Sequence, residues 1–65
     1  MTLQDLNSMI DHKTEVMNLE MHRGQIALDN GEMTKANNCL KICMRLSNDI
    51  LELEDQFMKA HQLKN

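Results

Sequence analysis

The sequence predicts an all-α protein, an antiparallel two-helix hairpin with coiled-coil-like packing. The 65-residue chain contains no proline, a residue that interrupts long helices. Its apolar residues recur at alternating spacings of three and four, the period of a helix seam. The pair Asn30-Gly31, near the midpoint, is a typical helix stop because both residues tolerate the left-handed backbone conformation. We therefore expect one helical-hairpin domain over residues 1–65.

The first helix is expected over about residues 3–29. Thr2 followed by Asp5 matches a capping box, in which the threonine hydroxyl accepts from an orphan backbone amide. The apolar residues that follow form one stripe, which we expect to face the second helix. This stripe consists of Leu3, Leu6, Ile10, Met17, Met21, Gly24 and Leu28, with Thr14 in its gap.

The second helix is expected over about residues 34–62, after a turn over about residues 30–33. Thr34 is the expected N-cap, or Asn30 if the turn is tighter. The apolar repeat of this helix is the clearest in the chain and is typical of a coiled-coil seam. Its members are Ala36, Cys39, Cys43, Leu46, Ile50, Leu53, Phe57 and Ala60.

A bend near Gly31 also predicts the register of the hairpin. Residues that face each other should have numbers that sum to about 63, because the two helices run antiparallel from that bend. Small residues then meet near the turn and large ones at the open end. The predicted apolar partners include Leu6 with Phe57, Ile10 with Leu53, Gly24 with Cys39 and Ala27 with Ala36. The predicted ion pairs are Lys13 with Asp49, Glu20 with Lys41 and Asp5 with Lys59.

Both helices carry apolar residues outside these seams. A two-helix hairpin has one internal interface, so a second stripe stays exposed, and exposed contiguous apolar surface is typical of an interaction site. The residues expected to contact a protein partner are Leu40, Met44, Leu51, Met58, Met9 and Val16. The expected partner is a second copy, which would complete a four-helix bundle, or another protein. The function expected is that of a small protein-binding adaptor, regulator or cochaperone.

The composition favours no enzymatic chemistry. The net charge of −3 does not attract nucleic acid, and no catalytic, cofactor, metal or small-molecule site is expected. Cys39 and Cys43 are expected to pack in the seam, since they close no long loop and match no zinc spacing. No signal-peptide pattern and no apolar run of membrane-spanning length is visible, so a cytoplasmic location away from membranes is expected.

Two alternative functions stay open. A basic strip of Lys35, Lys41 and Arg45 would suit an RNA-binding hairpin dimer, and in size the chain resembles plasmid copy-number regulators of that design. Asp49 would serve a small phosphatase, and the run from Ser47 to Leu51 occupies the place of the Ser-Gln-Glu-Leu-Asp signature of two-helix aspartyl-phosphate phosphatases, keeping its serine. The chain also resembles two-helix cochaperones of type III secretion. A bacterial or phage origin is expected from the small size and the methionine content of the chain.

Overall fold

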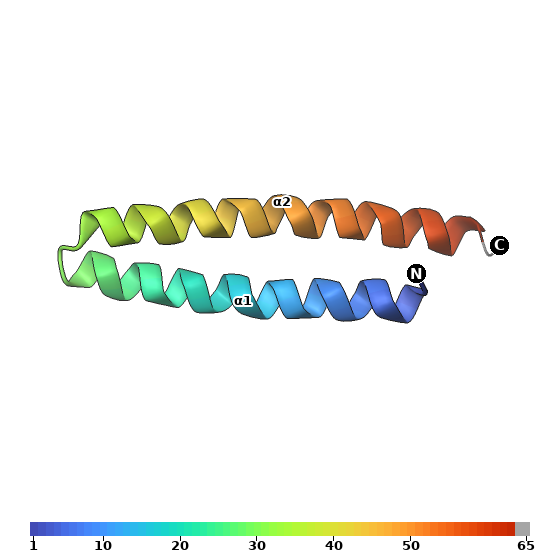
Figure 1. The fold of residues 1–65 in the computed structure, drawn as a ribbon, viewed down its shortest axis with the longest axis horizontal. Helices are drawn as coiled ribbons and strands as arrows, with labels where there is room; N and C mark the ends of the chain where they lie inside the picture. Colours follow the sequence, from blue (N-terminus) through green and yellow to red (C-terminus); the bar gives the residue numbers. More distant parts are fainter. Residues whose placement is uncertain (64–65) are drawn as a thin grey trace.

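The chain folds into two long antiparallel helices joined by a tight turn (Figure 1). The structure, a computed structural model, describes residues 1–63. Helix α1 spans Leu3–Asp29 and helix α2 spans Met33–Leu63. No strand occurs in the described residues. The predicted all-helical hairpin is confirmed, and its Cα atoms extend over 51 × 14 × 13 Å.

Helix α1 begins with the predicted capping box. The Thr2 hydroxyl accepts from the Asp5 backbone amide at 3.1 Å, and the Thr2 amide donates to the Asp5 carboxylate at 3.2 Å. These reciprocal bonds satisfy two donors at the end of the helix. The Thr2 backbone amide, followed by its hydroxyl, also holds the pKa of Asp5 below its usual value, since both stabilise the ionised carboxylate.

The turn after α1 is a Schellman motif centred on Gly31. The Gly31 amide donates to the Leu28 carbonyl at 3.0 Å, and the Glu32 amide donates to the Ala27 carbonyl at 2.8 Å. Gly31 has a φ of 74°, in the left-handed region that a side chain disfavours. The reversal of the chain therefore depends on backbone hydrogen bonds and one glycine.

Helix α2 begins one residue after this motif, at Met33. The Ala36 amide donates to the Glu32 carbonyl at 3.0 Å, which closes the first turn. The predicted caps are wrong, because Thr34 lies inside that first turn and Asn30 is the C-cap of α1. The Schellman motif leaves no loop between Gly31 and the new helix in which a separate capping residue could stand. Glu32 instead forms an ion pair with Lys35 at 2.9 Å.

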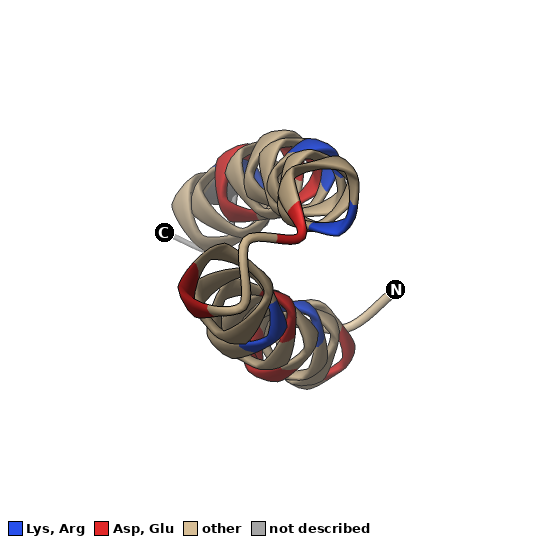
Figure 2. Ribbon diagram, turned by 90° about the vertical axis from the view of Figure 1, so that its left-hand side faces the viewer, with Lys and Arg blue, Asp and Glu red and all other residues tan. Residues whose placement is uncertain are grey.

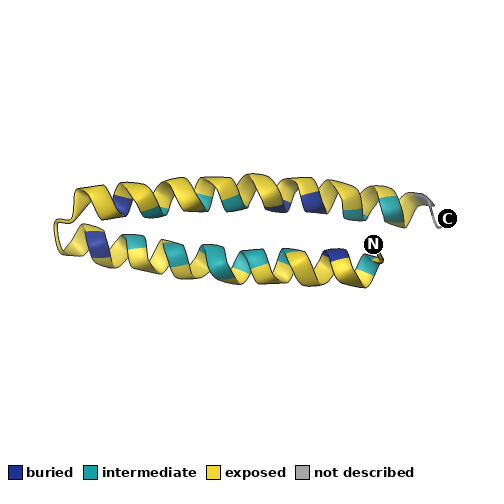
Figure 3. Cartoon of the chain, viewed as in Figure 1, coloured by how far each residue is buried: buried dark blue, intermediate teal, exposed yellow. Residues whose placement is uncertain are grey.

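The seam of α2 is the predicted one. Buried and half-buried segments line the facing sides of both helices, while the outer sides are exposed (Figure 3). All eight predicted seam residues of α2, from Ala36 to Ala60, are buried or half-buried. The repeat in this helix alternates three and four without a break, so one face stays turned toward α1 throughout.

The seam of α1 differs from the prediction. Met21 and Leu28 are exposed, and the neighbouring residues Glu20 and Ala27 take their places in the seam. The half-buried Lys13 occupies the gap together with Thr14. A step of one residue turns a helix by about 100°, which moves Met21 and Leu28 from the interface to its flank. The side chain of Glu20 is only 14% exposed, so a charged group lies within the seam.

Three contacts between α1 and α2 define the register of the hairpin. A Cβ atom built on Gly24 would lie 3.3 Å from the Cβ of Cys39, so the helices approach closely where the sequence provides small residues. The Cys43 thiol donates to the Met17 carbonyl at 3.7 Å. The predicted ion pair of Lys13 with Asp49 is confirmed at 3.3 Å.

The other two predicted ion pairs are wrong. Glu20 pairs with Arg23 at 3.3 Å, and Lys59 pairs with Asp55 at 2.9 Å. Partners three or four residues away on the same helix face are within reach without crossing the seam. Asp5 is engaged in its capping box instead.

Replacing Gly31 with alanine should lower the free energy of unfolding by about 1 kcal/mol, because an L side chain is strained at its positive φ. Thermal or urea unfolding followed by circular dichroism measures this change. Asn30→Ala is the control, since Asn30 has a φ of −89° that alanine adopts readily. Equal stability of Gly31→Ala and the wild type would contradict the assigned turn.

The lowered pKa of Asp5 predicts a pH-dependent contribution to stability. Folding favours the ionised carboxylate, so this contribution is complete above the ordinary value of 3.8 and is lost as pH falls through the lower folded pKa. Asp5→Asn should therefore melt at a lower temperature than the wild type at pH 7. The difference should shrink at pH 2 to 3, and a difference that is independent of pH would contradict the prediction.

Candidate functional site

The hairpin buries little of its surface. Its buried apolar side chains are Leu6, Ala27, Ala36, Ile50 and Leu53. The accessible surface is 5192 Å², whereas a compact monomer of this mass, 7.6 kDa, exposes about 4,300 Å². The excess of about 900 Å² follows from the elongated two-helix shape and gives the hairpin unusually extensive surface for contact with a partner.

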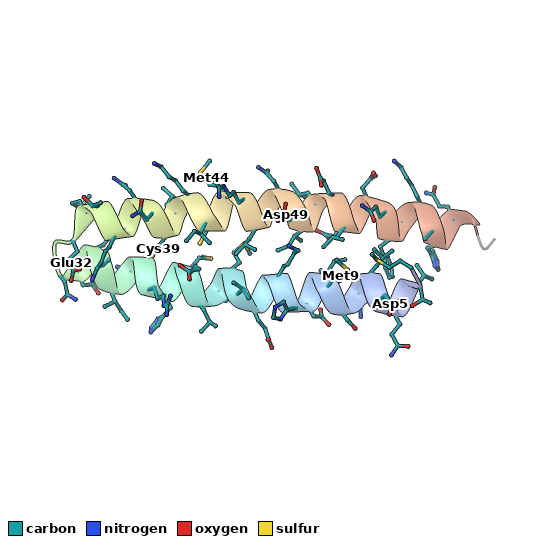
Figure 4. The ribbon with its side chains drawn as sticks, in the orientation of Figure 1. Asp5, Met9, Glu32, Cys39, Met44 and Asp49 are labelled. Atoms are coloured by element: carbon teal, nitrogen blue, oxygen red, sulfur yellow. The ribbon has the colours of Figure 1, made fainter. Side chains whose placement is uncertain are left out.

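An exposed apolar stripe lies along α2. We define the α2 face as five exposed residues of that helix, namely Met33, Leu40, Met44, Leu51 and Met58. Met44 projects from α2 away from α1 in Figure 4. The face extends over 26 residues, about 39 Å of helix at 1.5 Å per residue. It forms a stripe beside the seam, because Leu40, Met44, Leu51 and Met58 each directly follow a seam residue and Met33 lies one heptad before Leu40.

Helix α1 extends this apolar surface near the turn. A shallow groove there is lined by Met21 and Leu28 of α1 and by Leu40 of α2. Gly24, which has no side chain, and Ala36, which has a single methyl group, lie at the same groove and leave it unfilled. Met21 and Leu28 thus join the α2 face across the seam.

The opposite side of the hairpin has a different character. A second groove there is lined by Ile26 of α1 and Ile42 of α2, together with charged residues that include Arg23 and Lys35. Residues seven apart share a stripe of a helix, so this side also carries the stripe of Met9 and Val16 that leads to Arg23. Apolar and charged groups are mixed on this side.

The six predicted contact residues therefore do not form one surface. The structure brings Leu40, Met44, Leu51 and Met58 together on the α2 face. It separates them from Met9 and Val16, which belong to the opposite side, and Val16 is half-buried. The separation arises because the two stripes flank the seam on its two sides.

Sequence reasoning missed three residues of this apolar surface, Met21, Leu28 and Met33. A signal for the first two was present. A strict alternation of three and four from Leu3 leads through Lys13 and Glu20 to Ala27, which moves Met21 and Leu28 out of the seam. The charges of Lys13 and Glu20 concealed that continuous repeat.

Charges of both signs surround these surfaces. Basic and acidic segments occur along both helices in the end-on view of Figure 2. Of the basic strip, Lys35 is bound to Glu32, and this ion pair raises the pKa of the Lys35 ammonium. Asp49, the residue considered for phosphatase chemistry, is bound to Lys13 across the seam. Both alternative functions stay predictions.

The two cysteines lie in the seam as free, half-buried thiols. Burial, and next to it the nearby Glu20 carboxylate, raises the pKa of the Cys39 thiol. Among residues 1–63, no three His, Cys, Asp or Glu side chains gather in a way that could hold a metal ion. Cys39 packs closely against α1 beside Gly24, and the Cys43 thiol donates to the Met17 carbonyl.

No protein-family model, curated protein or solved structure matches this chain. Neither helix, over the part of the chain that the structure describes, combines the length and the apolar character needed to cross a membrane.

The raised pKa of Cys39 predicts a slow thiol. At pH 8.5 the native protein should be alkylated by iodoacetamide at Cys39 several-fold more slowly than the urea-unfolded chain, since the thiolate is the reacting species. Peptide mass spectrometry after timed quenching measures the rate at each cysteine. Equal rates in the native and unfolded chains would show that the seam does not enclose Cys39.

Proposed function

We propose that this chain is a protein-binding module whose α2 face docks on an apolar helix of a partner. The single observation that supports this proposal is the exposed stripe from Met33 to Met58, which follows α2 for most of its length. An apolar surface of this extent in water favours association. The groove beside Met21 and Leu28 widens the same surface near the turn.

The shape and chemistry of the face define the partner that it suits. A straight stripe about 39 Å long matches an amphipathic helix of similar length whose apolar residues repeat every seven positions. Three of its five side chains are methionines, which adapt to different apolar surfaces. A module of this kind acts by shielding or recruiting a partner helix, as an adaptor, a regulator or a cochaperone does. The free thiols of the seam suit a cytoplasmic location.

Site-specific photocrosslinking tests this proposal. A photoreactive amino acid replaces Leu51 in one protein and Leu19 in another, and each protein is irradiated in the cells that produce it. The two leucines are a matched pair, because they are 61% and 64% exposed. Leu19 lies one heptad before Ile26, which lines the groove on the opposite side of the hairpin. We expect adducts with a polypeptide from position 51 and few from position 19.

A second arm identifies the crosslinked partner. The mass of the adduct distinguishes a second copy of this chain, which adds 7.6 kDa, from a different protein. Equal yields from the two positions, or no adduct from position 51, would contradict docking through the α2 face.

A further inference from the structure

We propose that the helix that covers the α2 face is α2 of a second copy of this chain, bound antiparallel about a two-fold axis. This inference rests on the proposed function and names its partner. A two-fold dimer requires a surface that complements itself. The pattern of apolar, polar and charged residues along α2 meets this requirement.

The apolar residues of the α2 face match one another in reverse order. The stripe from Met33 to Met58 is centred between Arg45 and Leu46. A two-fold axis at that point places Leu40 opposite Leu51 of the second copy. It likewise places Met33 opposite Met58 and sets Met44 against the small Ser47. Each apolar layer then occurs twice, as in the core of an antiparallel coiled coil.

The polar residues follow the same axis. Asn37 and Glu54, the two remaining polar positions within the stripe, come opposite each other, and an amide can donate to a carboxylate. On the outer flank, Lys41 comes beside Asp55 of the second copy, once on each side of the axis. Asp55 already accepts from Lys59 at 2.9 Å, and its carboxylate has acceptor sites for a second donor. A parallel arrangement would instead leave Lys41 and Asp55 of the second copy fourteen residues apart along the helix axis, about 21 Å, and out of reach of each other.

The excess exposed surface of the hairpin is also similar in size to the area that a stable interface buries. The hairpin exposes about 900 Å² more surface than a compact monomer of its mass, and a stable interface buries about 800 Å² on each partner. Packing the α2 faces of two copies against each other would reduce the accessible surface area of each chain to about that of a compact monomer of the same mass. The flanking Met21 and Leu28 add apolar area next to the same helix.

Sedimentation equilibrium of the purified chain at tens of micromolar tests the proposal. We expect twice the mass of 7.6 kDa for the wild type. Leu51→Asp should weaken the dimer at least about a hundredfold, because it places a charge in an apolar interface. The matched variant Leu19→Asp should stay dimeric. Circular dichroism shows whether each variant keeps its helices.

A second pair of variants tests the antiparallel register. Lys41→Glu should weaken the dimer roughly tenfold, because two attractive pairs with Asp55 become repulsive. Arg45→Glu carries the same change of charge at a position that faces solvent and should leave association nearly unchanged. Equal weakening by both variants would overturn the register.

Two further results would overturn the dimer itself. One is a wild type that stays monomeric, and the other is a dimer that Leu51→Asp does not weaken. If adducts with a different protein still form at position 51, the proposed function stands and only its assignment to a second copy fails.

Discussion

One interface between two helices is the constraint on which the rest of this structure depends. A helix hairpin can hide one stripe of each helix, and the apolar residues of this chain exceed what those stripes hold. Hydrophobic burial is the dominant favourable term in folding, so burial of the stripe left outside is a favourable contribution that association can still add. The fold and the candidate site are therefore two consequences of the same repeat. Residues at the inner positions build the hairpin, and those beside them build the α2 face.

Charged residues in the seam of α1 favour one alignment of the two helices. Lys13 reaches Asp49 at the edge of the seam, and Glu20 reaches Arg23. A shift of the register would place these two partly buried charges against apolar side chains, at a cost in desolvation. Their contribution to stability is modest, since such pairs add about 0–1 kcal/mol where water reaches them. Their effect is to disfavour other alignments.

The sequence was sufficient for the class of fold, the capping box, the seam of α2 and the side of α2 that stays exposed. These features depend on local chemistry or on an unbroken repeat, and both can be recognised in the amino-acid sequence alone. The seam of α1 was harder to recognise, because a lysine and a glutamate occupy inner positions and conceal its continuous repeat. The misplaced ion pairs have a related cause, because partners on the same helix compete with those across the seam. The division of the candidate contact residues between two sides required the relative rotation of both helices.

The size gradient along the seam has a consequence for the order in which the hairpin assembles. Contacts beside the turn join residues that are close in the chain, so they close with the smallest loss of chain entropy. Yet Gly24, Ala27 and Ala36 offer little apolar area, whereas Leu6, Leu53 and Phe57 lie at the far end. The contacts with the lowest entropic cost thus bury the least apolar area, and those with the highest entropic cost bury the most. The apolar area buried per contact therefore increases from the turn toward the open end of the hairpin. The backbone hydrogen bonds around Gly31 hold the two helices together at the turn, where the interhelical contacts are smallest.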